Sequence, residues 1–211
     1  MALATTTLLA ALSLCAVHAP PQVFFVYSEK AAVIHHDQST KALGKSWQRP
    51  EAIQREFPIT GGYTNGKVKA DFEMQFAYQA YGAGNFCLWP GTVRVHVSYV
   101  PDVFIASDYR EGGCRYKDTL AHEFRHVHTD IDTLKKYLPA LENAARAEAR
   151  RMEAPPPMSQ SRMIRVRQEF IDRVQAAISV PLNKLDAERK EKQALIDTRQ
   201  EYLRASHACV R

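Results

Sequence analysis

The chain has 211 residues, with 28 Lys and Arg against 23 Asp and Glu, a net charge of +5, and 45% hydrophobic residues. This ordinary globular composition excludes a disordered chain, a collagen-like chain and a multi-span membrane protein, and the length suits one domain with its own core. The charge is uneven, because residues 146–211 hold 14 basic and 9 acidic side chains and account for the whole excess.

The first nineteen residues predict a signal peptide. They carry no charged side chain, their apolar run at residues 8–17 is too short to span a bilayer as a helix, and Ala19 ends a small-x-small motif. Cleavage after Ala19 would leave a single domain, residues 20–211, in the periplasm or secreted, without a transmembrane span. The alternatives are a lipoprotein acylated at Cys15 and a retained N-terminal helix.

Three cysteines would remain after this cleavage, in an oxidising compartment. Cys87 precedes a strand pattern and Cys114 closes a Gly-rich turn at the end of the same region, so we expect a disulfide between them. Cys209 is then free, or it displaces one of the other two, because spacing alone does not determine connectivity.

Residues 20–114 predict a small sheet. Runs of β-branched or aromatic residues, or strict alternation of polar and apolar residues, mark four segments: 22–35, 67–78, 93–99 and 103–106. Alternation with one polar face is typical of half-buried antiparallel strands. Pro101 indicates an edge position, because proline cannot donate a ladder hydrogen bond.

Residues 115–211 predict helices. Apolar residues at spacings of four and three indicate one long helix over about residues 117–153: Leu120, Phe124, Val127, Ile131, Leu134, Leu138 and Leu141. The prolines at 155–157 end it, a second helix follows, and Pro181 predicts a break before a third helix over about residues 182–206. The fold class is therefore α+β, an antiparallel sheet followed by a long helix and two further helices.

The first turns of the long helix contain His122-Glu123-Phe124-Arg125-His126, an HExxH sequence. Two histidines four residues apart lie on one helical face, where both can bind one Zn²⁺ at about 2.0–2.1 Å and the Glu can reach a metal-bound water. At about 100° per residue both histidines point away from the apolar stripe, so they are not core residues. They form either a solvated polar pair or the wall of a cleft covered by the C-terminal helices.

A sheet followed by an HExxH helix and further helices resembles the zincin metallopeptidases. More narrowly, residues 115–207, with Tyr202 and Ser206-His207 at their end, look like the uncharacterised, predicted secreted zinc-dependent proteases of bacteria. The resemblance covers about half of the chain. It implies that Glu123 is the general base on a zinc-bound water and that the substrate is a peptide. Arg125 departs from the pattern, since zincin peptidases prefer uncharged residues at this point of the motif.

The motif does not identify the third metal ligand. The pattern HExxHxxGxxH fails, because Thr129 replaces the Gly and Asp132 the last His, and a continuing helix carries Asp132 to another face. Asp130 lies too far along the helix axis to share an ion with both histidines, and is instead a candidate acceptor for His126. Later helices offer Glu169, Glu201 and His207, of which the resemblance favours His207, with Glu201 next.

These features predict an exported zinc-dependent hydrolase acting on peptides or proteins, with His122, His126 and His207 as ligands and Glu123 as the base. The alternative is a non-enzymatic envelope protein whose basic helical tail binds a partner or an anionic polymer. Interleaved acidic residues and few aromatic ones in that tail favour a solvated helical face, and nucleic acid is not an expected partner. The sequence indicates neither a particular substrate nor an oligomeric state.

Overall fold

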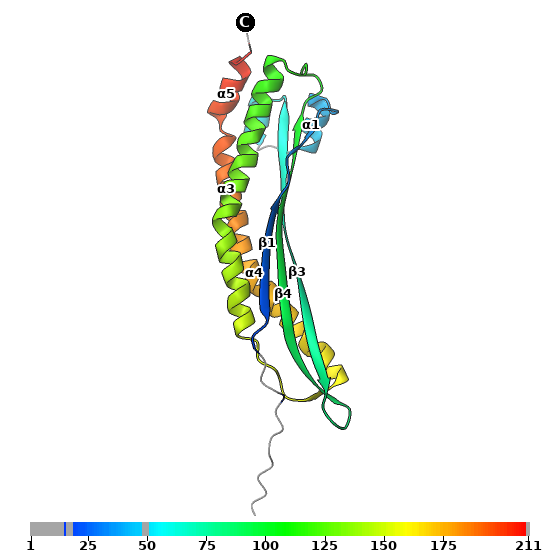
Figure 1. Cartoon of the computed structure of the whole chain (residues 1–211). Coiled ribbons are helices and arrows are strands. Elements are labelled where there is room, and N and C mark those ends of the chain that lie inside the picture. The colour runs from blue at the N-terminus through cyan, green and yellow to red at the C-terminus, as the bar shows by residue number, and fades with distance from the viewer. Residues whose placement is uncertain (1–14, 16–18, 48–50, 210–211) are drawn as a thin grey trace, which may run out of the picture.

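The computed structural model describes Cys15 and residues 19–47 and 51–209. The molecule is elongated, and two long antiparallel helices, α3 (Cys114–Arg150) and α4 (Gln160–Ile196), run along one face of a sheet (Figure 1). Two short helices, α1 (Thr40–Ser46) and α2 (Glu51–Glu56), lie between strands, and α5 (Arg199–His207) follows α4. The predicted order of a sheet followed by helices is confirmed.

The sheet has five strands: β1 (Gln22–Glu29), β2 (Val33–His35), β3 (Gly62–Ala80), β4 (Asn85–Ile105) and β5 (Met158–Ser159). β4 is central, with antiparallel β3 on one side and, on the other, β1 and β2 parallel to it and β5 antiparallel at its start. The sheet is therefore mixed, and the predicted antiparallel pairing is wrong for β1 and β2. Alternation reports which face of a strand is buried, but it contains no information about strand direction.

Pro101 does not mark an edge strand, because it lies within central β4. Main-chain groups two residues apart in a strand point to the same side, so Pro101 shares the side of Tyr99, whose carbonyl accepts the Lys30 N–H at 3.1 Å. On this side the pairing with β1 ends at Tyr99 and the pairing with β2 begins at Asp102. The missing N–H of Pro101 therefore lies between two ladders and interrupts neither.

The core lies between β4 and the two long helices. The buried residues of the three elements include Val93, Val95, Val97, Val127, Leu134, Leu141, Phe170, Val174 and Ile178. The α3 residues in this set belong to the predicted apolar stripe. A 37-residue helix such as α3 is about 55 Å long, and a 21-residue strand such as β4 is nearly 70 Å long. The long helices can therefore cover most of the length of the sheet.

The predicted helix break at Pro181 is wrong, since α4 continues through it. An internal proline costs about 3 kcal/mol, but Pro181 is buried together with Ile178 and Leu185, and burying each such apolar side chain contributes about 1.5–3 kcal/mol. The helix ends instead at Ile196, and Asp197, with φ −84° and ψ 51°, is its C-cap residue. Thr198 then caps α5, because its side chain accepts the Glu201 N–H at 3.2 Å.

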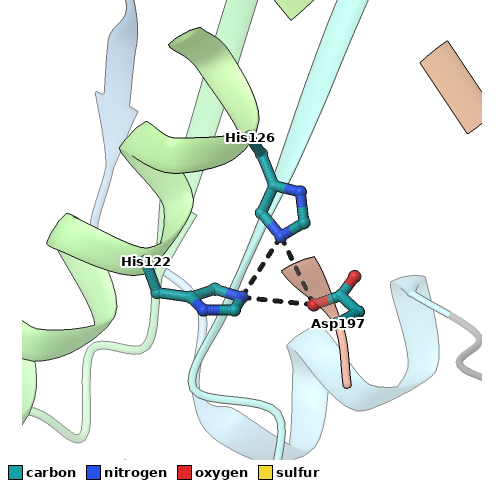
Figure 2. A group of neighbouring side chains, drawn as sticks. All are labelled: His122, His126 and Asp197. Atoms are coloured by element: carbon teal, nitrogen blue, oxygen red, sulfur yellow. Dashed lines mark hydrogen bonds and ion pairs between the residues drawn. The ribbon is translucent and has the colours of Figure 1, made fainter. Parts of the chain in front are cut away.

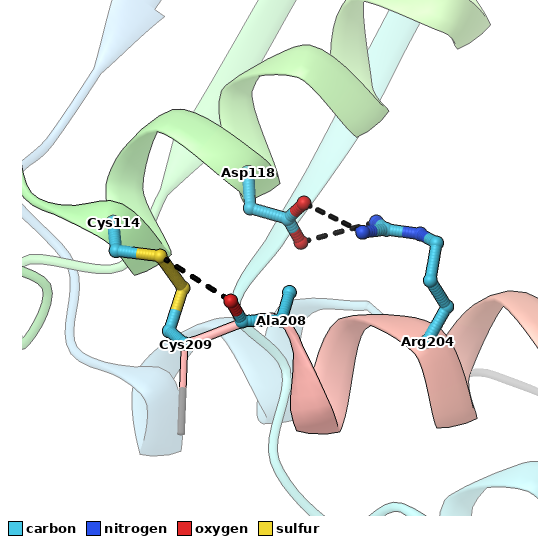
Figure 3. Close-up of a disulfide and its surroundings, with 5 residues drawn as sticks. All are labelled: Cys114, Asp118, Arg204, Ala208 and Cys209. Atoms are coloured by element: carbon cyan, nitrogen blue, oxygen red, sulfur yellow. Dashed lines mark hydrogen bonds and ion pairs between the residues drawn. A yellow bond between two sulfur atoms is a disulfide. The ribbon is translucent and has the colours of Figure 1, made fainter. Parts of the chain in front are cut away.

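All four cysteines are paired, as Cys15–Cys87 and Cys114–Cys209, so the predicted Cys87–Cys114 bridge is wrong. Of the two alternatives for Cys209, a free thiol is wrong, and displacement of one of the other two cysteines is confirmed, because Cys209 replaces Cys87 as the partner of Cys114. The strand from Cys87 to the end of β4 is about 60 Å long, whereas bridged Cα atoms lie within about 7 Å of each other. Cys87 and Cys114 are therefore at opposite ends of the molecule. Cys209 reaches Cys114 because α5 returns to the start of α3 (Figure 3).

The predicted leader lies outside the described residues, apart from Cys15 and Ala19. Cleavage after Ala19 would remove Cys15 and with it the Cys15–Cys87 bridge. The Cys114–Cys209 bridge is independent of such cleavage, because both cysteines follow Ala19. Within the part of the chain that is described, no helix has the length and apolarity needed to cross a bilayer.

Candidate metal centre

α3 carries a polar stripe at four-residue spacing, and α4 carries a complementary stripe that runs in the opposite direction. The contacts between the stripes join Asp130 to Arg189, His126 to Gln193, and His122 to Asp197. Each step is about one turn on both sides, because antiparallel helices advance with the same rise per residue. The end of α4 therefore lies opposite the first histidine of the motif.

Three side-chain atoms converge at this point (Figure 2). Asp197 Oδ1 lies 3.2 Å from His122 Nε2 and 3.3 Å from His126 Nε2, and the two Nε2 atoms are 3.2 Å apart. Three corners of a tetrahedron around an ion with bonds of about 2.0 Å are about 3.3 Å apart. The triangle therefore fits a small tetrahedral cation, and it is the one group of this kind among the described residues.

The imidazole nitrogens that point away from the triangle each meet an acceptor. His122 Nδ1 lies 3.2 Å from Glu201 Oε1, and His126 Nδ1 contacts Gln193 Oε1. When Nδ1–H donates to such an acceptor, the lone pair of a neutral imidazole is on Nε2 and is available to a metal. The ring of His126 is therefore oriented as a metal ligand. His122 Nδ1 faces a donor as well as an acceptor, because it also lies 2.8 Å from Arg125 Nη2, which can only donate.

Glu123 is buried, with 3% of its surface exposed, and its carboxylate lies against β3. The Thr64 hydroxyl donates to Oε2 at 2.9 Å, and a Cβ atom at Gly62 would be 3.0 Å from Oε1. Burial raises the pKa of Glu123, and the nearby charges of His122 and His126 oppose this rise only in part. The carboxyl group is therefore a stronger base than an exposed glutamate.

Without a metal, the contacts within the cluster favour its ionised form. Burial acts to lower the pKa of both His122 and His126, but their hydrogen bonds to Asp197 and the charge of Glu123 outweigh burial and raise it. Burial acts to raise the pKa of Asp197, but the hydrogen bonds from both histidines hold it well below its usual range. A metal that binds here must displace protons from the imidazoles.

The triangle and Glu123 line a cavity of about 870 Å³, a volume in the range of ligand sites. One wall is the edge of β3 at residues 62–66, where no described strand pairs on the outer side. Another wall is apolar and is formed by Trp47, Phe57, Ile59, Tyr63 and Tyr202. The cavity thus combines acid–base groups with a main-chain edge and an apolar surface.

The other candidate ligands lie elsewhere. The side chain of His207 is exposed on α5, with Nδ1 2.8 Å from the Leu203 carbonyl oxygen, and Glu169 and Asp132 are exposed on their helices. Glu201 contacts the outer nitrogen of His122 and is not part of the triangle. Arg125 is 48% exposed, pairs with Glu201 and lies 2.8 Å from His122 Nδ1. The structure therefore brings together His122, His126 and Asp197 rather than His207.

Sequence reasoning missed Asp197, although two signals bear on it. Thr198-x-x-Glu201 has the form of a capping box, which predicts a helix start directly after Asp197. Arg189, Gln193 and Asp197 also share the four-residue spacing of the polar stripe on α3. Together these signals would have placed a carboxylate at a helix end that can lie opposite the motif.

Comparison of the chain with protein-family models, with curated proteins and with solved structures finds no match. The resemblance to zincins therefore rests on the motif and the order of elements.

Proposed function

We propose that the protein is an exported zinc-dependent hydrolase in which His122, His126 and Asp197 hold the ion and Glu123 is the general base. The near-equilateral triangle of ligand atoms carries this proposal. Hydrogen bonds alone would not require the three distances between these atoms to be equal. A shared ion does require it, because its ligand atoms lie at the corners of a tetrahedron whose edges have one length. Asp197 takes the place expected for His207.

A bound zinc ion supplies a Lewis acid that polarises a carbonyl oxygen and lowers the pKa of water. Glu123 takes the proton of the attacking water and delivers it to the leaving group. Its pKa, raised by burial, brings it closer to the range in which a base works near neutral pH. Thr64 holds one carboxylate oxygen, so the acid–base group keeps a fixed orientation in the cavity.

Peptides are the substrate class that this cavity supports best. The Gly61 carbonyl accepts the Ala106 N–H, so the main-chain polar groups of Gly61 point toward β4. Because these groups alternate sides along a strand, those of Tyr63 also point toward β4, and those of Gly62 and Thr64 point outward. Their N–H and C=O groups line the cavity next to Glu123, where an extended peptide can pair with them. The apolar wall can accept its side chains.

The proposed location is outside the cytoplasm, in the periplasm or secreted. Disulfides are typical of proteins from an oxidising compartment, and the Cys114–Cys209 bridge lies in the part of the chain that leader cleavage would leave intact. The leader-like N-terminal sequence also supports export. A non-enzymatic role for a basic tail has less support, because seven cations of residues 146–211 form ion pairs within the molecule: Arg146, Arg151, Arg173, Arg189, Lys192, Arg199 and Arg204.

Metal analysis and peptide hydrolysis test this function together. Protein purified without chelator should contain about one zinc per chain and should cleave members of a fluorogenic peptide library. Glu123→Gln should keep the zinc and lose turnover, whereas His126→Ala should lose both. Wild-type protein that takes up no zinc when it is supplied would contradict the proposal, and so would undiminished turnover in Glu123→Gln.

A further inference from the structure

We propose that Gln193 is a positioning residue whose side-chain amide holds His126 in the tautomer that leaves Nε2 free for the metal. The inference rests on the proposed metal site, but its main observable is a property of the metal-free protein. Gln193 Oε1 contacts His126 Nδ1, while Gln193 Nε2 donates to Asp130 Oδ1 at 2.7 Å and to the His126 carbonyl oxygen at 3.1 Å.

The amide can have only one orientation. The carboxylate of Asp130 and the His126 carbonyl both only accept hydrogen bonds, so both require the NH₂ end of the amide. A flipped amide would place its oxygen against these two acceptors, where no hydrogen bond can form. Oε1 therefore faces Nδ1 of His126, and because Oε1 can only accept, Nδ1 must carry the proton.

Asp130 is itself held as an acceptor. It is 2% exposed, and it accepts two hydrogen bonds from Arg189 at 2.9 and 2.6 Å and one from the Tyr99 hydroxyl at 3.0 Å. Arg189 also donates to the Gly66 carbonyl at 2.9 Å. The hydrogen bonds of this half-buried chain orient one group after another, from Arg189 through Asp130 and Gln193 to the imidazole of His126.

An amide is suited to this position in a way that a carboxylate is not. A carboxylate at residue 193 would also accept from His126 Nδ1, but it would bring a second negative charge against Asp130. It would also lack the NH₂ group that Asp130 and the His126 carbonyl require. Gln193 thus transmits the orientation fixed by Asp130 without adding charge to the metal site.

Two measurements test the proposal on the full chain. Long-range ¹H–¹⁵N NMR of the imidazoles at alkaline pH, where they are neutral, identifies the protonated nitrogen of His126 in zinc-free protein. Competition with a chelating dye measures the Zn²⁺ dissociation constant. The variants are Gln193→Met, which preserves length but removes both hydrogen-bonding ends, and Gln175→Met, the same change on an exposed position of α4. Circular dichroism confirms that each variant is folded.

We expect His126 of the wild type to carry its proton on Nδ1, and Gln193→Met to show a tautomer mixture and to bind Zn²⁺ about 10–100-fold more weakly. Gln175→Met should match the wild type in both. A wild-type His126 protonated on Nε2 overturns the proposal without any variant, as does a folded Gln193→Met protein with unchanged tautomer and affinity. If the wild type binds no zinc but Gln193→Met shifts the tautomer, the proposed function fails and the positioning role stands.

Discussion

Removal of the Cys114–Cys209 bridge should weaken metal binding specifically, because that bridge secures a segment that contains no buried residue. Leu185 is the last residue of the described chain that is buried. Residues 186–209, which carry Gln193, Asp197 and Glu201, are therefore held by polar contacts, by the stacking of Tyr202 on Phe57 and by the disulfide at their end. Beside the bridge, Arg204 pairs with Asp118 at 2.7 Å (Figure 3), and a solvent-exposed pair of this kind contributes only about 0–1 kcal/mol.

The second disulfide provides a matched control. The bridges span sequence separations of 95 and 72 residues, and the chain-entropy account assigns each about 4–5 kcal/mol of stability. In the full chain, Cys114→Ala with Cys209→Ala and Cys15→Ala with Cys87→Ala should thus lower the free energy of unfolding by similar amounts. Only the first pair releases the segment that carries Asp197.

The assay is dye-competition titration of Zn²⁺ into both double variants at a temperature where both are folded, without thiol reductant. If the released segment is docked for only a tenth of the time, apparent affinity falls about tenfold, so we expect at least that loss for the Cys114/Cys209 variant. The Cys15/Cys87 variant should bind as the wild type does. Equal Zn²⁺ affinity in the two variants would refute the reasoning, because the bridge would then play no part in holding Asp197 in place.

Two further predictions concern the ligands and pH. Asp197→Ala should lose most of its zinc in metal analysis, while His207→Ala should keep a full complement; the reverse result would restore His207 as the third ligand. Folding raises the pKa values of His122 and His126. The two protonated histidines therefore stabilise the folded zinc-free protein below about pH 6.5. This stabilisation is lost as the pH rises through their pKa values in the folded state. Calorimetry should show the zinc-free midpoint falling over that range, and titration should show zinc affinity rising; flat profiles would contradict the ion-pair description.

Local patterns predicted the elements well, but not how distant segments meet. Alternation over residues 67–78 and 93–99 and the stripe that includes Val127 and Leu134 each report a burial pattern along one element. The direction of β1, the continuation of α4 through Pro181 and the disulfide pairing depend on contacts between elements. Tertiary burial overrode the helix-breaking tendency of Pro181, and the length of β4 separated Cys87 from Cys114.

The same distinction applies to the site. His122, Glu123 and His126 could be found from the sequence, because one helical turn brings them to one face. The third member of the triangle could not be found from the motif, because Asp197 is far away in the sequence and meets it only through the antiparallel packing of α3 and α4. His207 was favoured by resemblance alone, and nothing in the local pattern reported that its side chain is exposed.

Anomalous X-ray diffraction at the zinc edge, on crystals of protein loaded with Zn²⁺, tests the central claim most directly. We predict a single strong peak about 2.0–2.1 Å from His122 Nε2, His126 Nε2 and an oxygen of Asp197. A peak bound by other residues, or no peak between the two histidines at full zinc occupancy, would contradict the account.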